Sequence, residues 1–268
     1  MQKILLLVLV LSPLCLFAQG PYQIGARANG LANSTLAISD VWAVKNNIGA
    51  IGELSKTEIG LAYQNKYFLK EFSNQSLAVN YAASKGSFGF YFQQAGFNLY
   101  REITTGIGYG MKLSNNFSAG LSLNYHRISF GDIYGAKNSV SASIGLKYKL
   151  NKNVEFGTNI ANLNRAKITD VEDERFPTVF GLGMKYSFSE KAFWTIELEK
   201  DVIHPLNIKS GLELKAHEIL VLRIGVNTYP FQTAFGAGIN FKKWRLDLAA
   251  NWHSSLGVNP SAGLVYQF

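Results

Sequence analysis

The chain of 268 residues is poor in cysteine, proline and charged side chains. Its one cysteine, Cys15, lies close to the N-terminus, so the rest of the chain can form neither a disulfide nor a cysteine-based metal site. Only 16% of the residues are charged, against about 25% in an average soluble domain. The 26 basic residues outnumber the 18 acidic ones, but no recognition motif accompanies them, so we expect no nucleic-acid partner.

Long apolar runs are also scarce. The one near the N-terminus covers Ile4 to Phe17 and is shorter than the roughly 20 residues of a membrane-spanning helix. Lys3 precedes this run and Ala18-Gln19 follows it, which is typical of a secretory signal cleaved after Ala18. Later stretches are all too short for a second helical anchor, so the sequence predicts export to the periplasm, the outer membrane or beyond.

Strict alternation of apolar and polar residues dominates the chain from Lys56 onward. Val140, Ala142 and Ile144 alternate with Ser141 and Ser143, for example, and the same pattern recurs in other segments. Each segment has about 9–12 residues, the length with which a tilted strand crosses a bilayer. The pattern therefore predicts strands with one face toward lipid and the other toward a lumen.

About fourteen such segments follow one another, an even number as in single-chain outer-membrane barrels. They lie at roughly 56–66, 73–83, 87–97, 101–113, 117–129, 138–150, 154–163, 177–188, 192–202, 207–216, 219–229, 233–241, 244–253 and 261–268. We therefore predict an all-β fold, a transmembrane antiparallel β-barrel. Its register puts Leu248 toward lipid and Ala249 toward the lumen, so an arginine should be tolerated better at 249 than at 248, unless it strikes a plug in the lumen.

Tight and long connections alternate between these strands. The tight ones, such as Ser84-Lys85-Gly86 and Lys242-Lys243, are expected on the periplasmic side. Longer ones at 131–137, 164–176 and 254–260 are expected outside the cell, which places both termini in the periplasm.

Glycine repeats on the inward faces of several strands leave room in the lumen, as in Gly181 and Gly183 or Gly236 and Gly238. Residues 19–55 do not alternate and are too few for an independent domain, so we expect them to form an N-terminal hatch in that space. The chain then divides into a signal peptide (1–18), a hatch (19–55) and a barrel (56–268).

The last strand ends in alternating apolar residues, with Tyr266 and the terminal Phe268 among them. This ending resembles the closing-strand signal that the barrel assembly machinery of the outer membrane reads. The expected partners therefore include that machinery and the lipids of the outer membrane.

Catalytic and cofactor chemistry finds little support in the sequence. The four histidines are scattered and form no metal-ligand spacing, and the glycine runs lie inside strands instead of before a helix, so we expect no metal and no cofactor. His253 and Ser255 form the one pair that could suggest a lipid hydrolase, but a polar role in the lumen is the expected one.

Charged residues on the inward register could attract anionic solutes or could pair within the barrel. Pairing is the expected role, because buried charges are rarely left alone. Those of main interest are Lys147, Lys185, Glu197, Arg223, Arg245 and Asp247.

The hatch segment carries a family-specific pattern in Gly25, Arg27 and Gly30, followed by Asp40 and by Asn46-Asn47. It resembles the hatch motif of the FadL/PorV superfamily of outer-membrane barrels, which reads G-x-R-x-x-G, then Asp and Asn-Pro-Ala-Gly. The chain departs from this motif at Ile48-Gly49-Ala50, which stands in place of Pro-Ala-Gly.

The resemblance implies a non-enzymatic barrel with one of two roles. PorV-like members are accessories of type IX secretion that bind secretion proteins or exported clients, whereas FadL-like members are passive conduits for small hydrophobic molecules. The loop at 164–176 is rich in charged residues, such as Arg165 and Glu174, and makes a poor hydrophobic receptor. The sequence therefore favours the secretion accessory, with the conduit as the alternative and a lipid hydrolase as a distant third.

Overall fold

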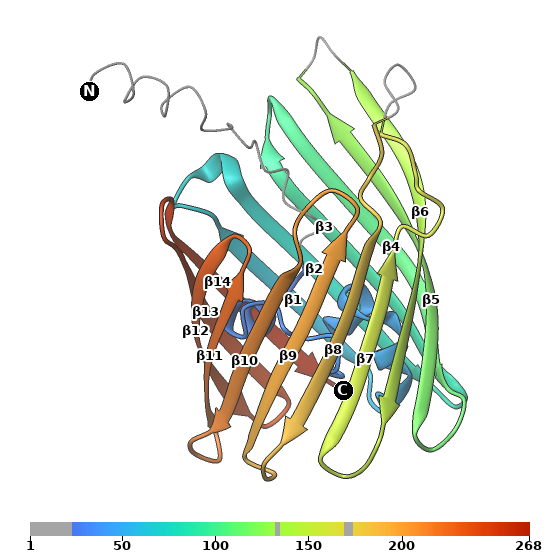
Figure 1. Cartoon of the computed structure of the whole chain (residues 1–268), viewed down its shortest axis with the longest axis vertical. Coiled ribbons are helices and arrows are strands. Elements are labelled where there is room, and N and C mark those ends of the chain that lie inside the picture. The colour runs from blue at the N-terminus through green and yellow to red at the C-terminus, as the bar shows by residue number, and fades with distance from the viewer. Residues whose placement is uncertain (1–22, 132–134, 169–173) are drawn as a thin grey trace, which may run out of the picture.

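A computed structural model describes residues 23–131, 135–168 and 174–268. They form a closed barrel of fourteen antiparallel strands in which each strand pairs with its sequence neighbours and β1 pairs with β14 (Figure 1). The predicted fold class and strand number are therefore confirmed. Among the described residues, no helix is both long and apolar enough to cross a membrane.

Most predicted strands end within about two residues of the observed ones. The strands are β1 (Glu58–Asn65), β2 (Ser73–Ala83), β3 (Gly86–Phe97), β4 (Tyr100–Lys112), β5 (Phe117–Ser129), β6 (Ala136–Lys149), β7 (Val154–Ala161), β8 (Val179–Ser187), β9 (Ala192–Asp201), β10 (Asn207–Lys215), β11 (Leu220–Thr228), β12 (Phe231–Phe241), β13 (Trp244–His253) and β14 (Gly257–Gln267).

The last strand is longer than predicted, because Pro260 lies inside β14, opposite Ala250, and not in a loop. Pairing between β14 and β1 ends one residue later, at Ser261 with Gln64, so one side of β14 has no partner strand at the proline. A strand tolerates proline at such an unpaired edge. The loop predicted at 254–260 is therefore a short turn.

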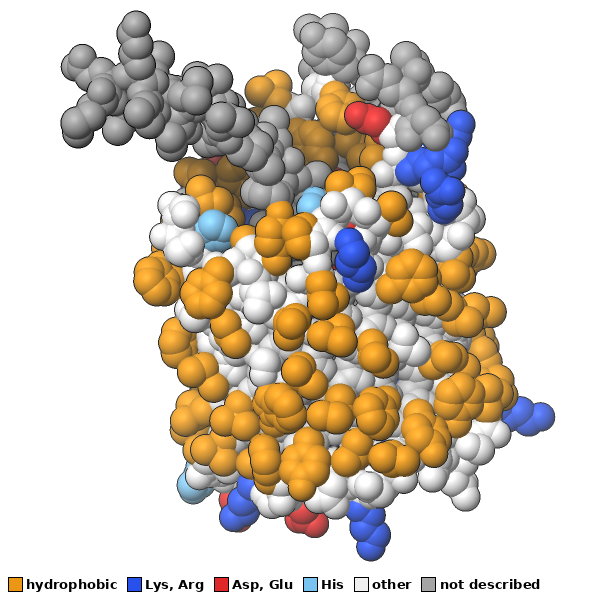
Figure 2. Space-filling view, in the orientation of Figure 1, with side chains coloured by type: hydrophobic (Ala, Val, Ile, Leu, Met, Phe, Trp, Pro, Cys, Tyr) orange, Lys and Arg blue, Asp and Glu red, His pale blue; other side chains and the backbone are white. Residues whose placement is uncertain are grey.

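The alternation in sequence becomes an apolar outer wall and a polar inner wall. On β5, Leu121 and Leu123 are 61% and 57% exposed, whereas Ser122 and Asn124 between them are 8% and 6% exposed. Figure 2 shows apolar side chains over the whole visible wall, with charged side chains mainly near its two ends. This is the surface of a barrel that faces lipid.

The tight turns lie together at the lower end of the barrel in Figure 1, and the longer connections lie at the upper end. The C-terminus belongs to the lower end, where the Gln267 backbone N–H donates a hydrogen bond of 2.9 Å to Lys243 in a tight turn. Above, the first long connection includes a short 3₁₀ helix, η2 (Lys70–Phe72).

The segment before β1 folds into the lumen, as predicted for a hatch (Figure 1). It contains the short helices α2 (Ala26–Gly30) and α3 (Ala43–Asn46) and the 3₁₀ helix η1 (Ile48–Glu53). The apolar core of the molecule lies where this hatch meets the wall. Its members are Ile24, Val41, Trp42, Ala43, Val44, Ile48, Ala50 and Ile51 from the hatch and Ala78, Tyr91 and Val265 from the strands.

Glycines of the wall let the hatch approach the strands closely. A Cβ added at Gly157 would lie 2.0 Å from the carbonyl oxygen of Leu36, and one added at Gly181 would lie 2.5 Å from the Leu36 side chain. Either distance is well inside van der Waals contact, so larger residues at these positions would exclude the hatch. The inward glycines therefore leave room for the hatch to pack against the wall, as the sequence suggested.

Candidate functional site

Arg27 of α2 fixes the hatch to the barrel wall. Its Nε and Nη2 donate two parallel hydrogen bonds, of 2.9 and 2.8 Å, to the carboxylate of Glu213 on β10. Its Nη1 pairs at 3.1 Å with Asp40, which also accepts the Trp42 backbone N–H. These contacts join the first helix of the hatch to its later part. A bidentate guanidinium contact of this kind is among the strongest and most directional in proteins.

On the wall, Glu213 belongs to a row of ion pairs that extends over the neighbouring strands. Arg223 donates to Glu213 and to Asp247, each at 2.7 Å, and Arg245 pairs with Asp247 at 2.9 Å. The side chains of Arg223 and Asp247 are only 2% and 1% exposed. Because each buried charge has an opposite partner, this part of the lumen is a closed network.

Lys147 of β6 anchors the other end of the hatch. Its Nζ lies 2.8 Å from Glu53 in η1 and 2.6 Å from Glu155 on β7, and it donates to the hydroxyl of Ser39 at 2.7 Å. Lys185 completes the cluster by pairing with Glu155 at 2.9 Å.

Glu197 of β9 holds the middle of the hatch. Its carboxylate accepts the backbone N–H groups of Thr35 and Leu36, at 2.9 and 3.1 Å, and pairs with Lys209 at 2.9 Å. All six lumen charges singled out from the sequence therefore have partners, and three of them, Lys147, Glu197 and Arg245, contact the hatch directly.

The two asparagines of the hatch motif bind backbone groups through their side chains. Asn47 accepts the Gly49 N–H at the start of η1 and donates to the carbonyls of Leu36 and Leu146, at 2.6 and 3.0 Å. Asn46 accepts the Ile24 N–H and donates to the Ile24 carbonyl.

The two motif glycines lie where a side chain would collide with its neighbours. Gly25 has a φ of 102°, and a Cβ there would meet the ring of Trp42 at 2.6 Å. Gly30 lies against Gly236, with 3.2 Å between its would-be Cβ and the Gly236 Cα. The structure therefore brings all six motif residues into the contacts that seat the hatch.

A cavity of about 430 Å³ lies between the hatch and the long connections. This volume falls within the roughly 300–1,000 Å³ of small-molecule sites. Part of its lining is apolar and aromatic, and comes from the hatch, from β3, β4, β7 and β8 and from the long connections: Leu36, Phe72, Tyr91, Ala95, Phe97, Tyr100, Ala161, Phe176, Pro177 and Val179.

One side of this cavity is polar. His126 donates or accepts at 2.8 Å with the hydroxyl of Ser141 and at 3.3 Å with that of Thr104, and its ring stacks on Phe176 at 4.4 Å between centroids. Lys66 also lines the cavity, and burial lowers its pKa to about 7 although Glu102 acts in the opposite direction. An apolar site with a few polar groups can hold and orient a small molecule.

The apolar lining is what sequence reasoning missed. The charged loop at 164–176 does present Arg165 and Lys167 to solvent, but Ala166 between them is 6% exposed, and Phe176 turns into the cavity. Counting the charges of the loop was therefore the wrong criterion, because alternation divides charged and apolar residues between its two sides. Asp170, Glu172 and Asp173, which that count included, lie outside the described residues.

The residues considered for chemistry have other contacts. His253 accepts the backbone N–H groups of Ser255 and Leu256 through Nδ1, both at 3.2 Å, and so caps a turn. Within the described part of the chain, no group of three or more histidine and carboxylate residues could hold a metal ion. Absence of enzymatic activity remains a prediction from the sequence.

At the C-terminus, Tyr266 contacts the ring of Trp244 at 4.6 Å and that of Phe268 at 4.9 Å, on the outer face. The role of these residues as an assembly signal also remains a prediction.

Comparisons with known proteins place the fold. No family model and no curated protein matched the chain. Among solved structures, the "CymD monoaromatic hydrocarbon channel" has a TM-score of 0.70 at 11% identity, and the match covers 91% of this chain and 97% of that one.

The toluene transporter TodX of P. putida has a TM-score of 0.69 at 12% identity, with 94% and 99% of the two chains covered. A Pseudomonas aeruginosa FadL homologue has a TM-score of 0.64 at 12% identity, with 92% and 98% covered. The chain therefore has the fold of FadL-type outer-membrane channels, in agreement with the resemblance seen in its hatch motif. The finer resemblance to PorV finds no support among these structures.

Proposed function

We propose that this protein is a passive outer-membrane conduit for small hydrophobic molecules, which it binds in the 430 Å³ cavity above the hatch. That cavity is the observation that carries the proposal. A cavity of about 150 Å³ lined by apolar side chains is enough to bind benzene, so this one has room for a monoaromatic hydrocarbon or a somewhat larger apolar molecule.

The position of the cavity supports a conduit. Phe72 and Phe176 come from long connections and Leu36 comes from the hatch, so the cavity lies on the path from the loop end toward the centre of the barrel. Below it, the ionic contacts of Arg27 and Lys147 hold the hatch across the lumen. A bound molecule would therefore wait above the hatch and pass when the hatch or the wall yields.

The comparisons favour this function over the secretion accessory that the sequence suggested. Of the three solved structures reported above, one is described as a hydrocarbon channel, one as a toluene transporter and one as a FadL homologue, and none is described as a secretion component. The charged loop, which was the argument for the accessory role, contributes Phe176 to the apolar cavity.

Equilibrium binding of toluene to the purified barrel tests the proposal. Ala161 lines the cavity at the upper end of β7, and Ala161→Trp would fill much of the apolar space. We expect the native protein to bind toluene saturably and Ala161→Trp to weaken binding at least about tenfold, since overpacking typically costs 1–3 kcal/mol.

Ala142→Trp on β6 is the matched control. Ala142 pairs with the lipid-facing Leu123, so this substitution adds the same indole to the outer wall instead of the cavity. Toluene affinity should be unchanged in this variant. Equal affinity in all three proteins, or no saturable binding to the native barrel, would contradict the proposal.

A further inference from the structure

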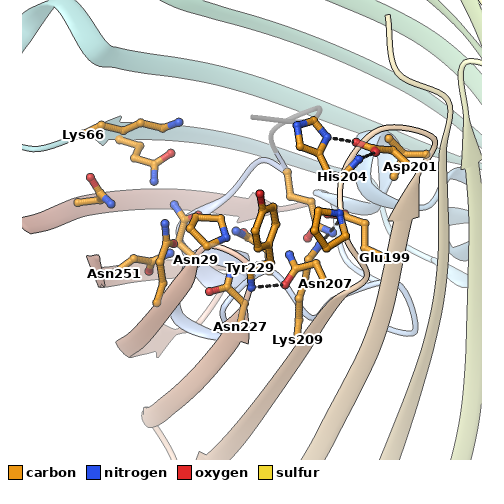
Figure 3. Close-up of a pocket in the computed structure, with 18 of the residues that line it drawn as sticks. Asn29, Lys66, Glu199, Asp201, His204, Asn207, Lys209, Asn227, Tyr229 and Asn251 are labelled. Atoms are coloured by element: carbon orange, nitrogen blue, oxygen red, sulfur yellow. Dashed lines mark hydrogen bonds and ion pairs between the residues drawn. The ribbon is translucent and has the colours of Figure 1, made fainter. Parts of the chain in front are cut away.

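A second, smaller cavity of about 150 Å³ adjoins the apolar one, and Figure 3 shows its lining. Asn29 and Asn33 of the hatch line it, as do Asn227 on β11 and Asn251 on β13. Tyr67 comes from the long connection after β1, and Tyr229 from the two-residue turn between β11 and β12. In contrast to the larger cavity, its lining is dominated by side-chain amides.

Several of these amides are buried without protein partners. Asn227 and Asn251 are 7% and 4% exposed, and their side-chain oxygens accept no hydrogen bond. The side-chain oxygen of Asn33 is likewise buried and unpartnered. An unsatisfied buried amide costs about 1–3 kcal/mol, so three around one cavity indicate that water or a polar ligand binds there.

The charged side chains that line the cavity, Lys66 among them, already have partners. Lys209 pairs with Glu197 and Glu199, at 2.9 and 2.6 Å, and His204 pairs with Asp201. The groups that remain for a ligand are therefore neutral amides, each of which offers both a donor and an acceptor. Hydroxyl groups, which also donate and accept, are the best complement to such a lining.

Two tyrosines border the amide-lined cavity, and the backbone N–H of each binds an asparagine that also lines the cavity. The Tyr229 N–H donates to Asn207 at 3.0 Å, and the Tyr67 N–H donates to Asn259 at 3.0 Å (Figure 3 shows the first). The rings offer apolar surface to the C–H groups of a ligand.

We propose that this cavity is a second binding site, for a neutral hydroxylated ring of monosaccharide size. The volume suits one six-membered ring, since an engineered apolar cavity of about 150 Å³ accepts benzene. The two cavities share Gln23, Lys66, Val179 and Glu199, but the asparagines that carry this proposal do not line the apolar cavity, and the proposal does not depend on the conduit function. Because Asn29 and Asn33 belong to the hatch, the site exists only while the hatch is seated.

Saturation-transfer NMR on the full-length barrel tests this site, with D-glucose, D-galactose and myo-inositol as probes. The protein is kept in a detergent without a sugar headgroup. We expect at least one probe to bind with a dissociation constant below about 1 mM. Asn227→Leu and Asn251→Leu should each weaken that binding at least about tenfold, the effect of losing one or two hydrogen bonds.

Ala161→Trp, in the apolar cavity, is the control and should leave probe binding unchanged. The shift in gel mobility on heating shows whether each variant has folded. The proposal is overturned if the native protein binds none of the three probes saturably, which would leave only water in the cavity. Unchanged affinity in both folded leucine variants, or displacement of the probe by toluene, would overturn it as well.

Discussion

Arg223 shows at the level of one residue how the lumen tolerates charge. It lies between Glu213 and Asp247 and is almost inaccessible to solvent. Glu213 is shared with Arg27 of the hatch, so the wall and the hatch depend on the same carboxylate. A single neutral substitution at this position leaves two carboxylates with fewer partners.

Arg223→Met should therefore destabilise the barrel by about 3–5 kcal/mol, the usual effect of breaking a buried ion pair from one side. Unfolding of the micelle-bound protein in urea measures this difference. Lys215→Met on the neighbouring strand end is the control, because Lys215 is exposed, and it should change stability by less than about 0.5 kcal/mol. Equal effects of the two substitutions would show that the ionic network is dispensable.

The register of β13 gives a second prediction for single residues. Leu248 is 52% exposed on the outer wall, so Leu248→Arg should cost about 2–4 kcal/mol near the bilayer centre and reduce assembly. Ala249 is 8% exposed and lies against Gly30 of the hatch, so Ala249→Arg should not be mild.

The two variants should fail in different ways. Ala249→Arg should leave an assembled barrel whose hatch is digested by trypsin, whereas assembled Leu248→Arg should keep its hatch protected. Heat-dependent gel mobility and limited proteolysis separate these outcomes. Protection of the hatch in Ala249→Arg would show that this contact does not hold it.

Lys66 should make the toluene affinity of the cavity depend on pH. Its pKa of about 7 reflects burial, and an apolar ligand that covers it further would lower that pKa again. Binding must then release a proton below pH 7, so toluene affinity should rise as the pH rises to about 7 and level off above it.

Lys66→Met removes the titrating group and should flatten that part of the profile. Titration of toluene binding between about pH 5 and pH 9 provides the comparison. An identical profile in the native protein and in Lys66→Met would show that this lysine is not covered by the ligand.

At the scale of elements, the hatch is a folded insert whose shape depends on the wall. Its helices α2 and α3 have only five and four residues, too short to be stable alone. The hatch as a whole is held by Glu197, Glu213 and Lys147 of the strands and by packing on inward glycines.

Gly157→Val should therefore unseat the hatch without disturbing the strands, because its side chain would occupy the place of the Leu36 carbonyl. We expect increased ion conductance in planar bilayers and faster proteolysis of residues 23–57. Ala142→Val on the lipid-facing side of β6 is the control and should behave like the native barrel. Unchanged conductance in folded Gly157→Val would mean that the hatch is not what closes the lumen.

The strands could be predicted from sequence and the cavity could not, for a physical reason. Alternation reports locally on which side of a strand meets lipid, so the register of Leu248 and Ala249 was correct. The cavity is formed by Leu36, Phe97 and Phe176, which are far apart in the chain and meet only in the closed barrel. The seat of Arg27 on Glu213 is a contact of the same long-range kind.

At the scale of the whole molecule, the lumen has three zones. Ion pairs and glycine contacts hold the hatch in its lower part. Above the hatch, an apolar cavity lies beside β3 to β8, and an amide-lined cavity lies beside β10 to β14. A general pore would need no such division. The arrangement suits a barrel that holds selected small molecules behind a closed hatch.

Uptake of labelled toluene by cells is the most direct test of the central claim, because the lipopolysaccharide layer of an outer membrane slows the entry of apolar molecules. The barrel is expressed in a Gram-negative host without other hydrocarbon channels, beside equal amounts of assembled Ala161→Trp and Ala142→Trp. The account predicts faster uptake with the native protein and with Ala142→Trp, and uptake near that of the empty host with Ala161→Trp. Uptake that does not depend on the native barrel, or that Ala161→Trp supports equally well, would contradict it.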